Sequence, residues 1–271
     1  MTTVSRALDH GLQILEFLAD QTEPQTLSDI CRRLELPKSS THRLLATLEK
    51  RGYVNRDSSL KYGFGPKLLE LVGAYDPWLR LRRAASPVMH DLAQRSGETC
   101  HLAVLFKGHA VYVDKVNSPR SISMASRIGS TAALHASSVG KALLSGLTSE
   151  DLDVFIAQHG LPRLTEKTIS CREELKGHLQ EVRAQGYAVD DEEEEEGVKC
   201  VGAPLFDHNG KVVAALSLAA LSVDVSQDRI LELAEMIREA AAKISYQLGY
   251  APRNLPGIGS GSFVDGDTSL A

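Results

Sequence analysis

The side chains best suited to recognition chemistry lie in the segment KSSTHRLLATLEK, residues 38–50. Leu44, Leu45 and Leu48 recur at helical spacing, and the turn of about 100° per residue directs the polar positions to the opposite side. That polar side contains hydroxyl, imidazole and basic groups, from Ser39, His42, Arg43 and Lys50. A short, basic helix face of this kind is suited to base edges and phosphates in the major groove of DNA.

The preceding residues complete a helix-turn-helix pattern. Residues 27–34 form another apolar helical pattern, which precedes residues 38–50 and is separated from them by Glu35-Leu36-Pro37. We expect Pro37 to occupy the first position of the second helix, where a missing N–H group costs nothing. Two helices joined by a tight turn are typical of proteins whose second helix enters the major groove. On these residues alone, an ordinary helical hairpin is the alternative.

A further helix and a hairpin would complete a domain around this motif. Helical spacing over residues 4–19 predicts a first helix that packs beneath the pair. Its expected buried positions are Leu8, Leu12, Leu15 and Leu18. After Gly52, alternating residues predict two short strands around a turn at Asp57-Ser58-Ser59, which would form the wing of a winged helix.

Two basic residues, Arg56 and Lys61, flank the turn of this predicted wing. There they would reach phosphate or the minor groove, although a solvated hairpin without contacts fits either residue alone equally well. The predicted DNA contacts are therefore Lys38, Ser39, Ser40, Thr41, His42, Arg43, Lys50, Arg56 and Lys61.

Charge is unevenly distributed along the chain, whose formal net charge is −5. Residues 32–67 contain nine basic and three acidic side chains, a local charge of +6, so the remainder of the chain has a charge of −11. A basic region on an acidic protein favours local, salt-sensitive contact with phosphates. The same balance argues against a protein that coats nucleic acid with its whole surface.

Length and composition favour two domains in a reducing compartment. At about 150 residues per domain, 271 residues predict two domains that each bury a core. The four cysteines have no paired spacing, which favours free thiols over disulfides or a zinc site. The N-terminal residues lack the apolar run of a signal peptide, and the longest apolar stretch, near residues 212–221, is too short to span a bilayer. We therefore expect a soluble, cytoplasmic protein with no membrane partner.

Beyond the predicted wing, two helical patterns form a linker. They cover residues 66–74 and 79–96, and Asp76-Pro77 interrupts them. From Thr99 apolar residues recur at alternate positions, as in strands, and no longer at helical spacing. Farther along, Asn209-Gly210 is a strong hairpin signal. The predicted strands cover residues 99–106, 110–116, 121–128, 200–206 and 212–219, and the predicted helices cover 149–159, 170–185 and 227–249. Hairpins separated by helices predict an α+β domain with a largely antiparallel sheet.

Two segments of this second domain contain groups that could bind a ligand. In residues 134–147, small and hydroxyl residues precede an apolar helix, whose free N–H groups would favour an anion. A plain helix cap formed by Ser137 or Ser138 is the alternative. The acidic run over residues 190–196 is expected to be a solvated loop. A metal site there is not expected, because adjacent carboxylates cannot all face one ion and no histidine joins them.

An enzyme is the competing class of protein. Ser138 and Lys141 fit the S-x-x-K pattern of acyl-serine enzymes, but the companion S-D-N and K-T-G motifs are missing. A phosphate-binding loop would need Ser or Thr after Lys141, where Ala142 stands instead. His101, His135 or Ser137 could be considered as a dyad, but lone histidines near apolar strands are more often structural. We therefore expect no catalytic residue, no cofactor and no enzymatic activity.

Several blocks, in a fixed order, resemble the isocitrate lyase regulator (IclR) family. They are SRALDHGLQILEFLA, LSDICRRLELPKSSTHRLLATLEKRGYV and YGFGPKLLEL, and the similarity continues to about residue 250. The resemblance implies an N-terminal winged helix-turn-helix domain over residues 1–66. A linker helix and a GAF-like α+β effector-binding domain would cover residues 67–251. The tail over residues 252–271 is rich in Gly, Ser and Asp, and we expect it to be disordered.

The resemblance also implies a function and a binding pocket. The function is that of a transcription regulator, repressor or activator, whose affinity for operator DNA changes when a small organic acid from a catabolic pathway binds. A homodimer or homotetramer is implied as well. The implied effector-binding residues are Met124, Ser138, Val139, Asp190, Cys200 and Ser217. The chain departs from the family pattern at Ser138-Val139, where relatives often have Gly or Ala, and at Ala219, where a second serine often stands.

Overall fold

The structure, a computed structural model, describes residues 5–74, 78–119 and 125–251. The chain divides into two compact units, Met1–Pro77 and Trp78–Ala271. The predicted boundary after residue 66 assigned the helix over residues 67–74 to the second domain, whereas its contacts group it with the first unit. Within the described ranges, none of the helices combines the length and the apolar character needed to cross a membrane.

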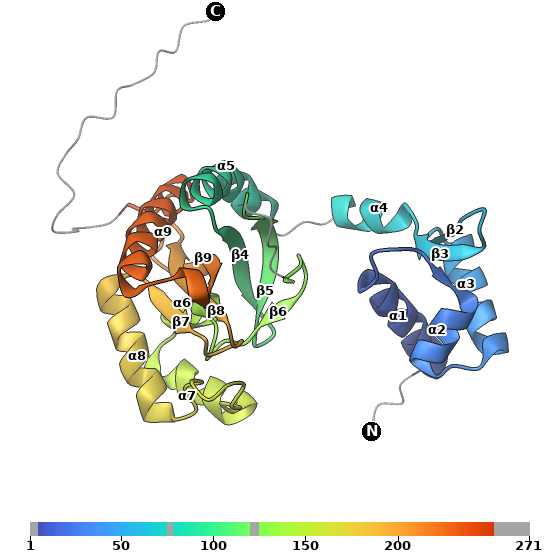
Figure 1. Ribbon diagram of the computed structural model, residues 1–271, viewed down its shortest axis with the longest axis horizontal. Coiled ribbons are helices and arrows are strands. Elements are labelled where there is room, and N and C mark those ends of the chain that lie inside the picture. Colours follow the sequence, from blue (N-terminus) through green and yellow to red (C-terminus); the bar gives the residue numbers. More distant parts are fainter. Residues whose placement is uncertain (1–4, 75–77, 120–124, 252–271) are drawn as a thin grey trace, which may run out of the picture. The chain divides into compact units, whose positions relative to one another are not determined.

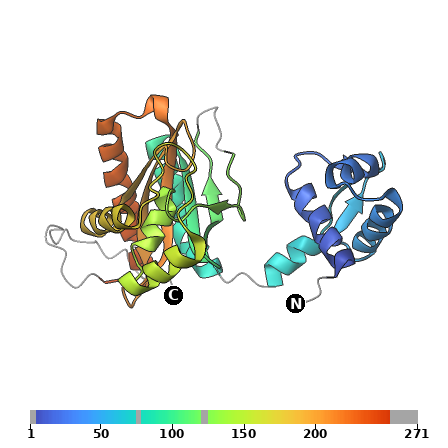
Figure 2. The ribbon, with the colours of Figure 1, turned by 90° about the horizontal axis from the view of Figure 1, so that it is seen from below.

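The first unit is a winged helix-turn-helix domain (Figure 2). Its elements are α1 (Arg6–Ala19), β1 (Gln25–Thr26), α2 (Leu27–Leu34), α3 (Lys38–Lys50), β2 (Val54–Arg56), β3 (Lys61–Phe64) and α4 (Lys67–Ala74). The three strands form one antiparallel sheet in the order β1-β3-β2. Helices α1, α2 and α3 and strands β2 and β3 contribute apolar side chains to a single core, made of Ile14, Leu18, Ile30, Leu45, Val54 and Tyr62.

Local interactions determine where the two motif helices begin and end. The Thr26 hydroxyl accepts a hydrogen bond from the Asp29 amide and donates one to the Asp29 carboxylate, so α2 begins at a capped turn. These bonds, with the Arg32 ion pair, hold the pKa of Asp29 below its ordinary value. At the other end, Glu35 has a left-handed backbone with φ of 54° and stops the helix. Pro37, whose backbone is extended, precedes α3 as its cap, one residue before its predicted position.

The buried face of α1 differs from the predicted one. Ile14 and Leu18 are buried, but Leu8 and Leu12 are 65% and 49% exposed. Only the C-terminal half of α1 therefore packs on α2 and α3 within this unit. Leucine spacing alone did not distinguish the buried half of the helix from the exposed half.

The second unit is an antiparallel sheet of six strands in the order β6-β5-β4-β9-β8-β7 (Figure 1). Its strands are β4 (Thr99–Phe106), β5 (His109–Val116), β6 (Thr131–Ala132), β7 (Ala188–Asp191), β8 (Val198–Phe206) and β9 (Val212–Leu221). The Asn209-Gly210 hairpin is confirmed, because Gly210 has a positive φ of 76° in the turn between β8 and β9. The predicted strand over 121–128 lies partly outside the described residues, and β5 pairs instead with β6.

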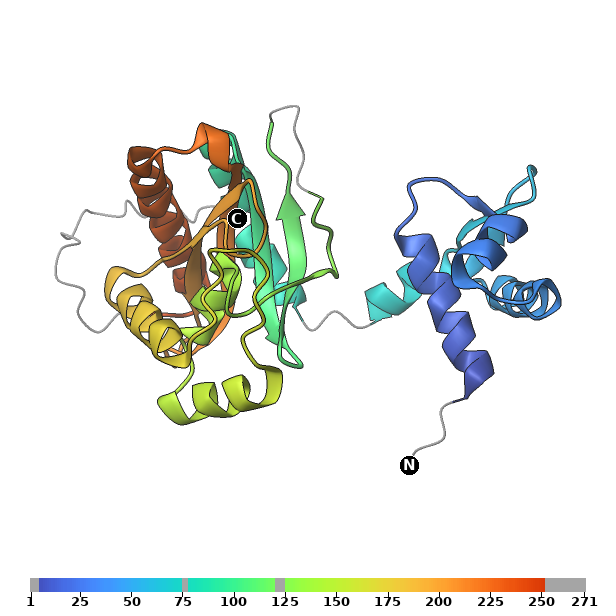
Figure 3. The same ribbon diagram turned by 60° about the horizontal axis from the view of Figure 1, so that its bottom comes forward.

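Helices cover both faces of this sheet. The long helices α5 (Leu79–Ser96) and α9 (Gln227–Gln247) pack on one face and bury a large apolar core with β4, β8 and β9. The other face is covered by α6 (Ser138–Leu144), with α8 (Arg172–Gln185) packed against α6. In Figure 3, α7 (Ser149–His159) is the helix at the bottom of this unit. We call the side of the sheet that faces α6 the α6 face.

Candidate DNA-binding surface and effector site

The outward face of α3 presents most of the predicted DNA-contacting residues to solvent. Lys38, Ser39, His42, Arg43 and Lys50 are all exposed. Because Leu44 and Leu45 face the core, the helical period turns these polar groups away from it. The exposed set combines one hydroxyl group, an imidazole and three cations. Its chemistry suits phosphates and base edges.

The hydroxyl groups of two further residues of the predicted set, Ser40 and Thr41, bond to the backbone at the start of α3. Thr41 has 0% exposure, and its hydroxyl donates to the Pro37 carbonyl over 3.0 Å. Its prediction as a DNA contact is therefore wrong, because position 41 lies one helical turn before Leu45 on the buried face. Ser40 is half-buried, and its hydroxyl donates to the same carbonyl over 2.8 Å. Both side chains stabilise the first turn of α3.

The wing places its two predicted basic contacts on a well-defined hairpin. The Asp57 carboxylate accepts the amides of Ser59 and Lys61, each over 2.9 Å, and closes the turn between β2 and β3. Arg56 is exposed, and its guanidinium lies 5.4 Å from the centre of the Tyr62 ring. Lys61 is exposed as well. The ring contact restrains the arginine side chain at the base of the wing.

Strand register brings three predicted effector residues to the α6 face of the second unit. Asp190 pairs with Cys200 between β7 and β8, and Cys200 pairs with Ala219 on β9. Directly opposite residues in an antiparallel pair point to the same face. Ser217, two residues before Ala219, shares that face, and it pairs with His101 on β4. Asp190, Cys200 and Ser217 thus line one side of the sheet together with His101.

The predicted residues of α6 approach the same region through a close backbone contact. A Cβ atom added to Gly202 would lie 2.7 Å from the carbonyl carbon and oxygen of Ser138, so only glycine lets the first turn of α6 lie on β8. The Ser137 hydroxyl caps this helix by accepting the Gly140 amide over 3.1 Å. Ser138 and Val139 are both buried. Met124, the remaining predicted effector residue, lies outside the described residues.

A buried ion pair stabilises the contact between α6 and the acidic segment that follows β7. The Lys141 ammonium, with 0% exposure, lies 2.5 Å from a carboxylate oxygen of Glu193, which is 6% exposed. The other oxygen of this carboxylate has no hydrogen-bond partner among the described residues. The prediction that the whole acidic run is a solvated loop is therefore wrong, because part of the run packs against α6.

Carboxyl groups outnumber buried cations in this region. Asp190 is 2% exposed and accepts the amides of Glu193 and Glu194 over 2.8 Å and 3.3 Å. Burial raises the pKa of Asp190 to about 7, and it does so against the opposing effect of the Lys141 ammonium. Burial also raises the pKa values of Glu193 and Glu194. At neutral pH the cluster therefore holds at least part of a proton.

Aromatic groups complete the α6 face. The His101 ring lies against Tyr112, with ring centres 4.7 Å apart, and its Nε2 atom is 2.7 Å from the Ser126 hydroxyl. Burial lowers the pKa of His101 to about 3, so its imidazole is neutral. Burial raises the pKa of Tyr112, and the negative charges of Glu194 and Asp190 raise it further. His101 Nδ1 has no hydrogen-bond partner in the described chain.

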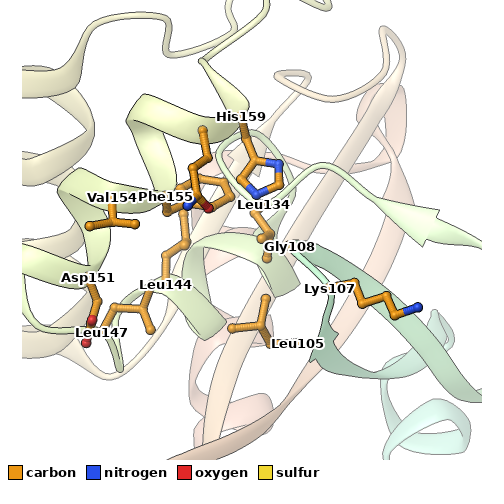
Figure 4. Close-up of a pocket in the computed structure, with 11 residues that line it drawn as sticks. Leu105, Lys107, Gly108, Leu134, Leu144, Leu147, Asp151, Val154, Phe155 and His159 are labelled. Carbon is orange, nitrogen blue, oxygen red and sulfur yellow. The ribbon is translucent and has the colours of Figure 1, made fainter. Parts of the chain in front are cut away.

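A separate cavity of about 480 Å³ lies near α7 (Figure 4). Leu105 and Gly108 at the β4–β5 turn, Leu134, Leu144 and Leu147 around α6, and α7 residues including Phe155 and His159 line it. None of the five predicted effector residues that the structure describes lines it. The His159 ring packs on Gly108, where an added Cβ atom would lie 2.4 Å from the imidazole. This cavity is mostly apolar and is distinct from the polar cluster around Asp190.

Sequence reasoning missed several groups of the polar cluster. Nothing distinguished Tyr112 from the other residues of its alternating strand, and nothing distinguished Glu193 and Glu194 from the other acidic residues of their run. Lys141 was considered only as part of an enzyme motif. Its position gave a usable signal, since a lysine surrounded by apolar residues in SVGKALL needs a buried partner.

The two units together define a class of protein. A winged helix-turn-helix with a basic outer face binds DNA, and a separate α+β domain with a buried polar cluster is suited to a small ligand. Such a combination is that of a ligand-responsive transcription regulator.

Comparisons with known proteins identify the family. Residues 7–58 match the IclR helix-turn-helix domain, and residues 77–246 match the C-terminal domain of the bacterial transcriptional regulator IclR. The chain is 33% identical over 252 residues to the HTH-type transcriptional regulator XynR of Escherichia coli, a match that covers 91% of this chain and 98% of the relative. The chain therefore belongs to the IclR family of transcriptional regulators. It is not an enzyme, and the predicted winged-helix and α+β architecture is confirmed.

Solved structures of other proteins contain both of these domains. The crystal structure of the Thermotoga maritima IclR aligns with a TM-score of 0.77 at 32% identity, covering 90% of this chain and 98% of that chain. An IclR homologue from Microbacterium hydrocarbonoxydans, crystallised with 4-hydroxybenzoate, aligns with a TM-score of 0.75 at 29% identity and covers 89% and 98% of the two chains.

Proposed function

We propose that this regulator binds a roughly palindromic operator as a homodimer or a dimer of dimers, and that a small organic acid on the α6 face changes its operator affinity. The protein would act in the cytoplasm, where its operator lies. The observation that supports this proposal most directly is the exposed polar face of α3, beside a wing that presents two further cations. Binding DNA with these groups requires no rearrangement within the first unit.

For the DNA contacts, the proposed set is the predicted one without the buried Thr41. It consists of Lys38, Ser39, Ser40, His42, Arg43, Lys50, Arg56 and Lys61. Arg43 is exposed on the second turn of α3, early enough in the helix to reach a base edge. The cations at the end of α3 and in the wing are placed for phosphates.

For the effector, the proposed contacts are Met124, Ser138, Val139, Asp190, Cys200 and Ser217. Register and packing support this assignment, because the strand residues share the α6 face and the first turn of α6 lies on Gly202 opposite Ser217. A relative of the same fold was crystallised with 4-hydroxybenzoate, an aromatic monocarboxylic acid, which supports an organic acid as the class of ligand. The hydroxyl groups of Ser138 and Ser217 are small neutral donors for such an acid.

One experiment tests both parts of the proposal. The purified protein is used to select its operator from random duplex DNA, and a gel shift on that operator is then repeated with a panel of small organic acids. We expect one acid to change operator affinity by a coupling factor of about 5–150-fold. Ser138→Trp should abolish the response to the acid while basal operator binding persists, because the indole would occupy the space beside Ser217 and Cys200. A variant that still responds normally would place the effector elsewhere, for example in the cavity beside α7.

A further inference from the structure

The cluster around Asp190 has a charge balance that restricts how an acid can bind. Lys141 is the only lysine or arginine buried within the described ranges, and its ammonium is already paired with Glu193. Asp190 and Glu194 therefore have no buried cation of their own. If both were ionised, the carboxylate of an effector would be a third negative charge in a poorly solvated site, and such an arrangement is strongly unfavourable.

Titratable groups approach Asp190 from every element packed around it. They are Lys141 from α6, Glu193 and Glu194 from the segment after β7, Cys200 from β8 and Tyr112 from β5. His101 lies against Tyr112, and His135 and His178 lie near Lys141, where burial and, to a smaller extent, the ammonium lower their pKa values. Burial thus holds His101 and His178 neutral near pH 7 and works against a positive charge on His135, so it opposes compensation of an incoming acid's charge by these groups.

Both amide hydrogen bonds of Asp190 go to one of its oxygens. Its Oδ1 atom accepts the amides of Glu193 and Glu194, and neither of these two bonds uses Oδ2. A proton on Oδ2 would convert this oxygen into a donor, and hydrogen bonds from a hydroxyl to a carboxylate are short and strong. On the same face, the buried Nδ1 atom of His101 is without a partner among the described residues, an independent sign that a ligand completes this site.

Resting on the function proposed above, we propose that an anionic effector binds only when the site holds one proton, which is taken from solvent wherever the free protein lacks it. Asp190 holds that proton, and its neutral carboxyl donates a hydrogen bond to the carboxylate of the effector. No ion pair forms between effector and protein. The site therefore selects monocarboxylic acids that present one carboxylate to Asp190, and it disfavours dianions, which would need a second proton.

Ligand affinity should consequently depend on pH. With the pKa of Asp190 near 7, the protonated fraction falls from about nine-tenths at pH 6 to about one-tenth at pH 8. The apparent Kd for an acid should therefore rise about tenfold between these pH values, because only the protonated form binds. A neutral ligand of the same shape should show no such dependence.

The test uses calorimetry on the full chain with two probes, pyruvate and 4-hydroxybenzoate, and with the matching amides, pyruvamide and 4-hydroxybenzamide. Each is titrated at pH 6 and pH 8, in buffers with different ionisation enthalpies that report proton uptake. Asp190→Asn keeps a donor without titrating, so it should bind the acid with equal affinity at both pH values. Asp191→Asn is the matched control, because Asp191 is paired with Lys167 and Lys199 and should not affect the tenfold dependence.

The outcomes separate this inference from the function on which it rests. An acid that binds wild type with pH-independent affinity, or without proton uptake at pH 8, where the free protein is mostly unprotonated at Asp190, would overturn the inference and leave the effector site in place. Loss of acid binding in Asp190→Asn would overturn it as well, since an ionised aspartate would then be required. If neither acid binds wild type or Asp190→Asn at either pH, the anionic effector of the proposed function is itself refuted, although operator binding stands.

A second measurement needs no ligand. Because the pKa of Asp190 is raised above its value of about 3.9 in an unfolded chain, the folded protein binds a proton that the unfolded chain lacks between about pH 4 and pH 7. Stability should therefore fall as pH rises through this window, and Asp190→Asn should show a smaller fall, since only the raised pKa values of Glu193 and Glu194 remain in this cluster. Thermal unfolding at pH 5 and pH 8 measures the difference, and parallel profiles for the two proteins would show that Asp190 is ionised throughout.

Discussion

Arg43 is the residue on which sequence preference is expected to depend. A bidentate contact from arginine to guanine contributes about 1–3 kcal/mol of discrimination, whereas a lysine on phosphate contributes equally for all sequences. Arg43→Ala should therefore reduce the ratio of operator to random-DNA affinity. Lys50→Ala should weaken both affinities alike and reduce the slope of affinity against salt by about one.

Fluorescence anisotropy on operator and scrambled duplexes measures both effects. Arg33→Ala is the control, since Arg33 is exposed on α2 and outside the proposed contact set. Unchanged affinities for both duplexes in Arg43→Ala would exclude Arg43 as a contact.

Gly202 is the residue on which the packing of α6 depends. Its alanine variant would bring Cβ to 2.7 Å from the Ser138 backbone, so α6 would have to move away from the sheet. We expect Gly202→Ala to destabilise the second unit by about 1–3 kcal/mol, the usual cost of overpacking. Gly177→Ala is the control, because nothing lies within 4 Å of its added Cβ in α8, and alanine there should stabilise by about 0.5–1 kcal/mol. Urea denaturation followed by circular dichroism compares both variants with wild type. A stability of Gly202→Ala equal to that of wild type would show that α6 adjusts without cost.

At the scale of single residues, the sequence predicted the exposed groups better than the buried ones. Arg43 and Lys50 face outward because three leucines define the inner face of α3. Thr41 shares that inner face, yet its hydroxyl suggested DNA contact, and only the hydrogen bond to Pro37 reveals its structural role. The pair of Lys141 and Glu193 is 52 residues apart in sequence, so no local pattern reports it.

At the scale of elements, two hairpin turns have nearly the same construction. In the wing, Asp57 accepts the Ser59 and Lys61 amides, and Leu60 has a φ of 61°. Between β8 and β9, Asp207 accepts the Asn209 and Lys211 amides, and the corresponding residue is Gly210, with a φ of 76°. The wing thus has a leucine at a backbone conformation that favours glycine.

Leu60→Gly should therefore stabilise the first unit. The left-handed conformation costs a residue with a side chain about 1–2 kcal/mol, and the greater freedom of glycine in the unfolded chain returns about 0.5–1 kcal/mol. A net gain of about 0.5–1 kcal/mol follows, since Leu60 is largely exposed and loses little packing. The thermal midpoint for unfolding of the first unit measures the gain. Gly210→Leu, in the second unit, is the reciprocal variant and should destabilise that unit. A loss of stability in Leu60→Gly would mean that this leucine packs on a partner in the assembled protein.

Most elements followed from sequence periodicity, and the exceptions have physical reasons. The helix over residues 79–96 was predicted at its observed bounds, since its apolar stripe is continuous and Gly97 ends it in a left-handed conformation. Strand β7 was not predicted, because it is four residues long and begins the acidic run. Its pairing with β8 compensates for the unfavourable local charge. Pairing of this kind is a tertiary effect that a single segment cannot reveal.

At the scale of the whole molecule, the change from helical to alternating periodicity near Thr99 predicted two architectures in one chain. The observed division at residues 77 and 78 falls where Asp76-Pro77 interrupts the helical pattern. The location of the proposed effector contacts was beyond such reasoning. Asp190, Cys200 and Ser217 meet only because β7, β8 and β9 are adjacent in the sheet, and this strand order has no signature in the local sequence.

The assembled regulator should protect two half-sites on its operator. A two-fold protein presents its two α3 helices to matching sequences separated by one or more helical turns of DNA, about 10–10.5 base pairs each. Hydroxyl-radical footprinting at increasing protein concentration should show both half-sites protected together, since one dimer occupies them. Inserting five base pairs between the half-sites should abolish tight binding, because half a helical turn places one of them on the opposite side of the duplex, whereas inserting ten should restore it in part. Protection of one unpaired half-site, or tolerance of the five-base-pair insertion, would show that the chain binds its operator without two-fold symmetry.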